Sequence, residues 1–350
     1  MPLPNDEQLA LASLCAILSR RQVRRLIEVH GQPTAAWASV QGDRSVKVAP
    51  ASVGAVCQRL GLELLSFLDA DYPAQLKHIP DPPLVLYLRG DRWLLADPGV
   101  AVVGARRCSR VGADIAANLG AGLAAAGLTV VSGLALGIDS AAHRGALQAA
   151  SAASGRALAV LGSGLTGIYP RSNARLAEAL VAAGGLLVSE YPPEAPPAKH
   201  QFPERNRLIS GLSMGVVLVE AGERSGSLIT ARLALEQGRE VMAVPGSLSG
   251  GRSRGCHRML KQGAALVEGV TDVCQALGYQ LPPREREALP AGAELARVLA
   301  AVGPGVLSLD EIAQAAGVGA EIAAAQLLVL ELEGFVAQVA GGYIRRPSPE

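Results

Sequence analysis

One short segment of the chain brings together cations, an aromatic ring and an amide. Residues 199–210 contain Lys199, Phe202, Arg205, Asn206 and Arg207, and Phe202 is one of only three phenylalanines in the sequence. Cations neutralise phosphates, an aromatic face stacks on a base, and an amide makes polar contacts, which together suit a single nucleic-acid strand. The segment therefore predicts a single-strand site. The alternative is that Phe202 lies in a core and the arginines pair with nearby glutamates.

Glycine-rich loops offer a second kind of anion contact. They start at Gly104, Gly133, Gly162 and Ala221, each directly after a run that reads as a strand. A strand that ends in glycine and leads into a helix exposes backbone N–H groups, which hold phosphate. The first of these loops is also basic, so we expect it to form the second wall of the site; its cations are Arg106, Arg107 and Arg110.

Two patterns in the sequence are typical of enzymes, but the residues around them support them less well than they support the nucleic-acid site. Residues 162–167 match the G-x-G-x-x-G spacing of dinucleotide sites, with Glu190 about 23 residues after the last of them. The third glycine does not open a helix, however, because Ile168-Tyr169-Pro170 intervenes. Ser132, Asp139 and His143 suggest a hydrolase triad, but the last two lie one helical turn apart, where a local contact on one helix face is expected. We therefore expect no catalytic residue and no nucleotide cofactor.

Composition restricts the classes of protein to which this chain can belong. Lysine and arginine number 32 and aspartate and glutamate 31, so attraction to nucleic acid must come from a local patch. The five cysteines are scattered without a C-x-x-C pair, which argues against disulfides and a zinc site, and Cys108 in the basic loop is expected to pack. The N-terminus lacks a signal pattern and no apolar run of about 20 residues occurs, which predicts a cytoplasmic protein that contacts no membrane.

The segment that contains the site residues has the strand and helix alternation of an α/β fold. Between residues 100 and 278, short β-branched runs alternate with helical stretches rich in alanine and leucine. The expected strands cover residues 84–88, 100–103, 129–132, 157–161, 186–189, 216–220 and 240–244. This alternation predicts a doubly wound, mostly parallel sheet, in which ligands bind beyond the carboxyl ends of the strands.

Smaller domains are expected at both ends. Residues 1–66 read as a helical domain of the SAM or helix-hairpin-helix type, with helices over residues 8–18, 20–30, 33–40 and 51–61. The core domain covers residues 67–279 and a polar linker residues 280–292. Residues 293–346 read as helices followed by a strand pair, the layout of a winged helix. The N-terminal domain would contact DNA backbones or serve as a cap or docking domain. The C-terminal domain would bind DNA, contact protein or be vestigial.

Ordered motifs across residues 70–275 resemble the DNA-processing protein A (DprA/Smf) family. They include Val103-Gly104-Ala105-Arg106, Ser132-Gly133-Leu134-Ala135-Leu136-Gly137-Ile138-Asp139, Phe202-Pro203-Glu204-Arg205-Asn206-Arg207, Ser225-Gly226-Ser227-Leu228-Ile229-Thr230 and Val244-Pro245-Gly246. The resemblance implies an extended Rossmann-like core that binds single-stranded DNA, forms a homodimer and catalyses no reaction. It also implies that the protein protects incoming DNA and helps to load the RecA recombinase in natural transformation and recombination.

The resemblance assigns roles to individual residues. The family's first arginine falls on Arg106, its pocket lysine on Lys199 and its stacking aromatic on Phe202. Ala105 stands where the family often has a hydroxyl, and we expect its backbone amide to serve instead. The expected single-strand contacts are Gly104, Arg106, Ser109, Arg110, Gly162, Gly164, Lys199, Phe202, Arg205, Asn206, Arg207, Ser225, Gly226 and Ser227.

Two rival functions use the same core. The core also resembles nucleoside monophosphate phosphoribohydrolases, which carry a P-G-G-x-G-T phosphate motif. The corresponding strand here leads into residues 220–227 without the Pro-Gly-Gly opening. The second rival is an adaptor that has lost DNA binding, against which the presence of Arg106, Lys199 and Phe202 speaks.

Overall fold

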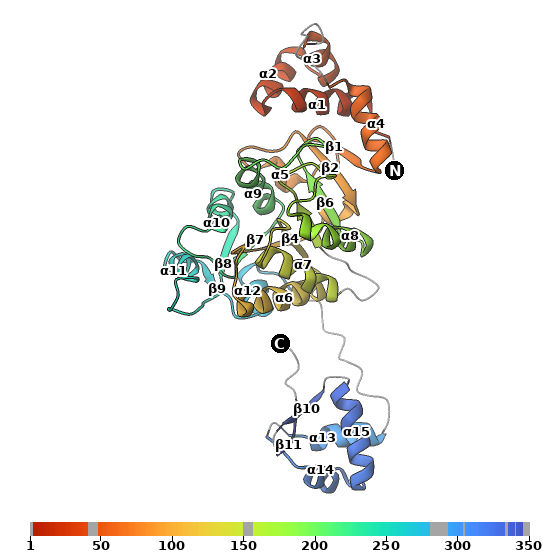
Figure 1. The fold of residues 1–350 in the computed structure, drawn as a ribbon, viewed down its shortest axis with the longest axis vertical. Coiled ribbons are helices and arrows are strands. Elements are labelled where there is room, and N and C mark those ends of the chain that lie inside the picture. The colour runs from red at the N-terminus through yellow and green to blue at the C-terminus, as the bar shows by residue number, and fades with distance from the viewer. Residues whose placement is uncertain are drawn as a thin grey trace. The chain divides into compact units, whose positions relative to one another are not determined.

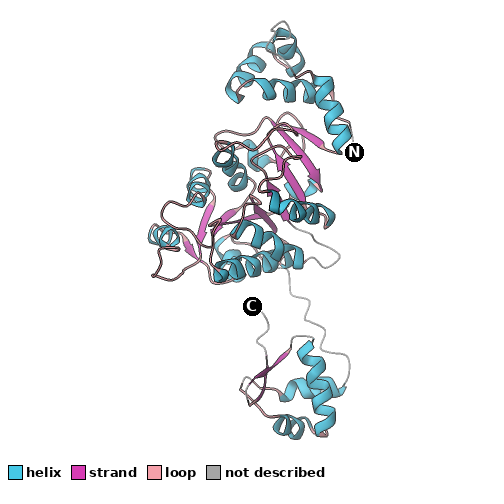
Figure 2. Ribbon diagram, viewed as in Figure 1, coloured by secondary structure: helices cyan, strands magenta, loops and turns pink. Residues whose placement is uncertain are grey.

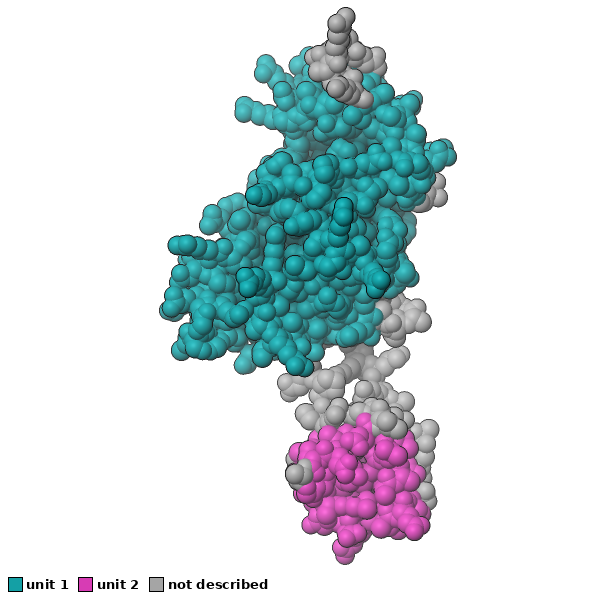
Figure 3. All heavy atoms as spheres, in the orientation of Figure 1, with its two compact units in different colours: residues 1–280 teal, residues 281–350 magenta. Residues whose placement is uncertain are grey.

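The computed structural model describes residues 3–40, 48–149, 157–280, 293–303, 305–332, 335–339 and 341–345. The chain forms two compact units, residues 1–280 and 281–350 (Figure 3). The predicted linker falls largely on residues 281–292, which lie outside the described residues. Each unit is described by itself.

The first unit begins with a group of short helices (Figure 1). These are α1 (Asp6–Ile17), α2 (Arg20–His30), α3 (Pro33–Val40) and α4 (Pro50–Leu60). Asn5 and Ser19 cap α1 and α2 in reciprocal capping boxes, which fixes where both helices start. Gly61 ends α4 in the left-handed conformation, at φ 60°. The predicted helical domain is confirmed, with helix bounds that differ by at most two residues.

A nine-stranded sheet forms the centre of the first unit. Its strands are β1 (Glu63–Ser66), β2 (Val85–Gly90), β3 (Gly99–Val103), β4 (Thr129–Ser132), β5 (Ala157–Val160), β6 (Leu186–Ser189), β7 (Gly215–Leu218), β8 (Glu240–Ala243) and β9 (Ala265–Leu266). They are ordered β1-β2-β6-β5-β4-β3-β7-β8-β9. All pairs from β6 to β9 are parallel, whereas β2 is antiparallel to both neighbours. The predicted mostly parallel sheet is therefore confirmed.

The sequence pattern does not predict the two edge strands. The predicted helical domain includes residues 63–66, but the structure places them in the sheet as β1, so the core begins at least four residues earlier than predicted. Strand β9 has only two residues and lies within a stretch without β-branched periodicity. Both strands are set by pairing with a neighbour, β2 or β8, which is information that a local pattern does not contain.

Helices cover both faces of the sheet (Figures 1 and 2). They are α6 (Arg110–Ala125), α7 (Ile138–Gln148), α8 (Ala174–Ala182), α9 (Gln201–Gly211), α10 (Ser227–Glu236), α11 (Arg254–Lys261) and α12 (Val270–Ala276), besides the short α5 (Ala74–Lys77). Alternate residues of β3 enter different cores. Val100 and Val102 pack in the core that contains Leu119 and Leu123 of α6, and Ala101 and Val103 in the core that contains Leu208 of α9. Burial on both faces explains the nearly unbroken apolar runs.

The second unit contains α13 (Ala293–Ala301), α14 (Leu309–Ala316), α15 (Ala320–Leu332), β10 (Val336–Val339) and β11 (Gly342–Arg345). Ser308 caps α14 in a capping box with Glu311, which fixes where this helix starts. β10 and β11 form an antiparallel pair that follows the three helices (Figure 2). Within the described ranges no single helix has the length and apolar character to cross a bilayer, and α14 and α15 reach that composition only as a pair bent by 102°.

Candidate functional site

A cleft of about 810 Å³ opens at the carboxyl ends of the central strands. The chain adds β4, β5 and β6 on one side of β3, and then returns to add β7, β8 and β9 on the other side. Such a reversal leaves a crevice between the loops of the two strands at its centre, where α/β sheets bind ligands. The cleft is lined by Val103 at the end of β3 with residues 104–106 after it, by Gly222 and residues 224–227 after β7, and by residues of α9.

Helix α9 presents one of its faces to the cleft. Phe202, Asn206 and Ile209 line it, at spacings of four and three residues that place them on the same side of a helix. Lys199 lines the cleft directly before the helix. The structure thus brings together the lysine, the aromatic ring and the amide that the sequence singles out.

Phe202 lies in an aromatic and cationic environment. Its ring centroid is 5.3 Å from that of Tyr169, with the rings tilted by 41°, and the Arg106 guanidinium lies 5.4 Å from the Phe202 centroid. Gly162 lies behind the ring, where a Cβ atom would come within 2.9 Å of Phe202 Cδ1. Gly162 therefore makes room for the ring and is not itself among the residues that line the cleft. Tyr169, which the sequence does not assign to the site, is 46% exposed and extends the aromatic surface.

Three exposed cations line the same cleft as this aromatic surface. Arg106, Lys199 and Arg224 all line the cleft and are exposed. Within the described residues, none of these three side chains forms an ion pair or a hydrogen bond. Among the same residues, the side-chain amide of Asn206 forms no hydrogen bond either. Arg224 is absent from the predicted set, although its position in the glycine-rich loop after β7 is the signal that finds it. These groups are available to an anionic ligand.

The loop ends supply further polar groups. Ser225, Gly226 and Ser227 line the cleft, and α10 begins at Ser227. The first N–H groups of α10 already donate within this loop, from Leu228 to the Ser225 carbonyl and from Ile229 to the Gly226 carbonyl, both at 3.1 Å. Gly104 also lines it, and a Cβ there would come within 2.9 Å of the Glu220 carbonyl oxygen. The expectation for Ala105 is wrong: its N–H already donates to the Glu220 carbonyl at 2.7 Å, so the amide is not available to a ligand.

Arg205 lines the cleft but is only 4% exposed. Its guanidinium donates hydrogen bonds to the carbonyl oxygens of Gly133 and Val160. Burial lowers the pKa of Arg205 to about 10, while the charge of Asp139 acts in the opposite direction. Its donors hold the ends of β4 and β5 together, which is a structural role and differs from the expected phosphate contact.

Four other predicted residues lie outside the cleft. Arg207 forms ion pairs with Glu190 and Asp81 on the other side of α9. Ser109 caps α6, and its hydroxyl donates to Glu220 Oε2 at 2.6 Å. Gly164 packs against Pro192 and Pro193, and Arg110 is the exposed first residue of α6. Of the predicted set, the cleft therefore gathers Gly104, Arg106, Lys199, Phe202, Arg205, Asn206, Ser225, Gly226 and Ser227.

The alternative chemistries are not supported by the geometry. Asp139 Oδ2 accepts hydrogen bonds from the N–H groups of Gly133 and Ala135, at 3.1 and 3.4 Å, and burial raises its pKa. Neither ring nitrogen of the buried His143 has a hydrogen-bond partner, so no relay joins it to Asp139. Burial, and then the charge of Glu220, raise the pKa of Cys108, which leaves it a packing residue. The residues described form no cluster of metal ligands.

His143 makes a pH-dependent contribution to stability. Burial lowers its pKa to about 3 in the folded chain, compared with about 6.5 for an unfolded histidine. Below pH 6.5 His143 is therefore protonated in the unfolded state but remains neutral in the folded state. The free energy of unfolding falls as the pH decreases. Between pH 6 and 4 we expect this group to account for about 1.4 kcal/mol of unfolding free energy per pH unit.

Chemical denaturation of the His143→Leu variant across this pH range measures that contribution. In the His143→Leu variant the unfolding free energy should depend less steeply on pH. A His30→Leu control, at an exposed site, should keep the pH dependence of the native protein. Equal slopes in the native and His143→Leu proteins would contradict the assignment.

Comparison with known proteins relates the chain to a family. Residues 63–278 match the family model described as DNA recombination-mediator protein A, and residues 282–342 match the DprA winged helix domain, which confirms the predicted C-terminal fold. Protein Smf of Escherichia coli is 44% identical over 78% of this chain and 75% of its own length. DNA processing protein DprA of Streptococcus pneumoniae is 47% identical over 59% of this chain and 72% of its own length.

Solved structures show the same likeness. The X-ray structure of DprA from Streptococcus pneumoniae matches with a TM-score of 0.65 and 38% identity, and covers 77% of this chain and 97% of its own. A structure of DprA from Helicobacter pylori matches with a TM-score of 0.56 and 31% identity, and covers 63% of this chain and 97% of its own. That structure is described as giving insight into the single-stranded DNA binding mode of the Helicobacter pylori protein.

Proposed function

Because the chain belongs to the DNA recombination-mediator protein A (DprA/Smf) family, we propose that it binds single-stranded DNA in the cleft between β3, β7 and α9. The observation that carries the proposal is the position of Phe202. Its ring lines the cleft beside Tyr169, and the exposed cations Arg106, Lys199 and Arg224 line the same cleft. This arrangement provides a stacking surface and phosphate contacts within one site.

In the proposed complex the phosphates contact the three cations. A base stacks on Phe202, and the Asn206 amide provides a polar contact at its edge. Stacking accepts every base, so sequence preference is slight. A duplex hides the faces of its bases, so single strands bind in preference. The single-strand binding mode described for the Helicobacter pylori protein supports this proposal.

The proposal extends to the wider role of the protein. We infer that the chain acts without catalysing a reaction, as a cytoplasmic homodimer that protects incoming strands and helps to load the RecA recombinase in transformation and recombination. The similarity to Smf and DprA proteins along most of the chain supports this role. Sedimentation velocity at micromolar concentration tests the dimer, and a monomer would contradict it. A strand-exchange assay with RecA tests the loading step.

Fluorescence anisotropy of a labelled homopolymer strand, compared with its duplex, tests the proposed binding. We expect the single strand to bind at least tenfold more tightly, because only its bases reach Phe202. The logarithm of the affinity should fall with that of salt concentration with a slope of about 2, since three phosphate contacts contribute roughly 0.7 each. Equal affinities for strand and duplex would contradict the proposal.

A further inference from the structure

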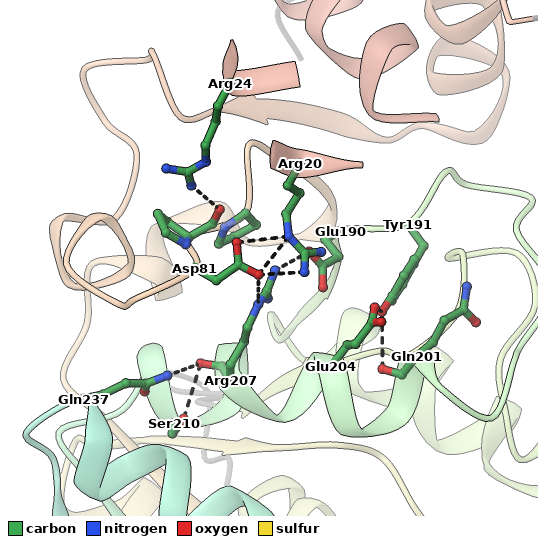
Figure 4. A network of polar contacts seen from close by, with 12 residues as sticks. Arg20, Arg24, Asp81, Glu190, Tyr191, Gln201, Glu204, Arg207, Ser210 and Gln237 are labelled. Atoms are coloured by element: carbon green, nitrogen blue, oxygen red, sulfur yellow. Dashed lines mark hydrogen bonds and ion pairs between the residues drawn. The ribbon is translucent and has the colours of Figure 1, made fainter. Parts of the chain in front are cut away.

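A ring of charges connects the N-terminal helices to α9 (Figure 4). Arg20, the first residue of α2, pairs with Asp81 at 2.7 Å and with Glu190 at 3.0 Å. Arg207 of α9 pairs with the same two carboxylates, with Glu190 at 2.6 Å and with Asp81 at 3.4 Å. The four side chains come from four separate segments, and their charges alternate around a closed ring of zero net charge.

The inner half of the ring is buried. The side chains of Glu190 and Arg207 are 5% and 8% exposed, whereas those of Arg20 and Asp81 are 29% and 46% exposed. Both arginines donate to the same oxygen, Glu190 Oε2. A buried carboxylate is tolerated only while its charge is compensated, so the loss of Arg20 would leave Glu190 with Arg207 as its one partner in the ring. Arg20 therefore helps to compensate the charge of Glu190, and through Glu190 it influences the buried ion pair between Glu190 and Arg207.

The ring also fixes the orientation of α9. Arg207 lies on the face of α9 opposite Arg205, because residues two apart on a helix differ by about 200°. The backbone carbonyl of Arg207 accepts a hydrogen bond from Gln237 Nε2 at 3.1 Å, and the Tyr191 hydroxyl donates to Glu204 at 3.1 Å. These contacts hold one side of the helix, while Phe202 and Asn206 on its other side line the cleft.

We propose that Arg20 is a positioning residue for α9, so that docking of the N-terminal helices through the ring sets the affinity of the cleft for its ligand. The inference rests on the proposed binding of single-stranded DNA. Arg20 itself is not among the residues that line the cleft. It acts through Glu190 and Arg207: when the ring is complete, α9 is held in the rotation that presents Phe202 to a base. Preorganisation of this kind raises affinity because the ligand does not have to order the helix.

Two measurements on the full chain test the inference. Arg20→Gln removes the outer charge, and Arg25→Gln is the matched control, since Arg25 is an exposed residue of the same helix outside the ring. We expect Arg20→Gln to weaken binding of a homopolymer strand at least fivefold and to accelerate amide hydrogen exchange in residues 201–211. Exchange in β3 and β7 should remain unchanged, and the control should behave as the native chain in both measurements.

A double-mutant cycle distinguishes positioning from an independent effect. If Arg20 acts through Arg207, the Arg20→Gln and Arg207→Gln double variant should bind no more weakly than Arg207→Gln alone. Additive losses would overturn the inference, as would unchanged exchange in α9 of Arg20→Gln. If Arg20→Gln also accelerates exchange throughout α1–α4, Asp81→Asn replaces it, because that change breaks the ring from outside the helices. Unchanged α9 exchange in Asp81→Asn then overturns the inference.

The exchange measurement separates this inference from the proposed function. If the native chain does not bind single strands, the proposed function fails. Exchange in α9 still reports whether Arg20 positions the helix, because it requires no DNA. If the native chain binds and Arg20→Gln matches Arg25→Gln in both measurements, the proposed function stands and the role of Arg20 is refuted.

Discussion

Combined replacement of Lys199 and Phe202 by alanine is expected to remove tight binding of single-stranded DNA. Phe202 provides the stacking surface, and the loss of one stacked base costs about 1–3 kcal/mol, which corresponds to roughly 5- to 150-fold in affinity. Lys199 is an exposed cation without an ion pair among the described residues. Its removal should lower the salt slope by about 0.7, the value for one phosphate contact. The two losses together exceed either one alone.

Anisotropy titrations of both single variants and the double variant measure these contributions. Phe202→Ala should weaken binding to all homopolymers similarly and leave the salt slope unchanged, because stacking involves no counterion release. Lys199→Ala should change the slope. Lys261→Ala is the control, since Lys261 is an exposed lysine at the end of α11 and does not line the cleft. Native affinity in the double variant would place the binding site elsewhere on the molecule.

The central strands were predictable because burial on both faces makes each of them a continuous apolar run. The strand bounds predicted for β4 and β6 agree with the structure, and those for β3 and β8 differ by one residue. By contrast, β1 is defined by its antiparallel register with β2, in which Glu63 pairs with Leu88. A four-residue strand at a sheet edge has too little pattern of its own to be distinguished from the helical segment before it.

The sequence indicates which residue types form the site, but it does not indicate which way each side chain faces. Phe202 and Asn206 are one helical turn apart, so a helix beginning near residue 201 places both at the cleft. Arg205 and Arg207 belong to the same motif but lie on opposite sides of α9, one beneath the cleft and one in the charge ring. Only the packing of α9 against the sheet determines which face points where. Arg224 was not predicted, because the orientation of the loop after β7 depends on the same packing.

Replacement of Arg205 by methionine is expected to destabilise the first unit by about 1–3 kcal/mol for each buried carbonyl that loses its donor. The side chain is 4% exposed and donates to the carbonyl oxygens of Gly133 and Val160, which would lose these donors. The buried Asp139 would also lose the positive charge that acts against its raised pKa. For a unit of this size the change corresponds to a decrease of roughly 10 °C in Tm.

Calorimetry of Arg205→Met beside Asn206→Ala tests this structural role. Asn206 is the next residue in the chain and faces the cleft, so its replacement should leave Tm unchanged while weakening DNA binding. The double variant Arg205→Met with Asp139→Asn should recover part of the lost stability, because it removes the uncompensated charge as well as its partner. A native Tm in Arg205→Met would contradict this structural role.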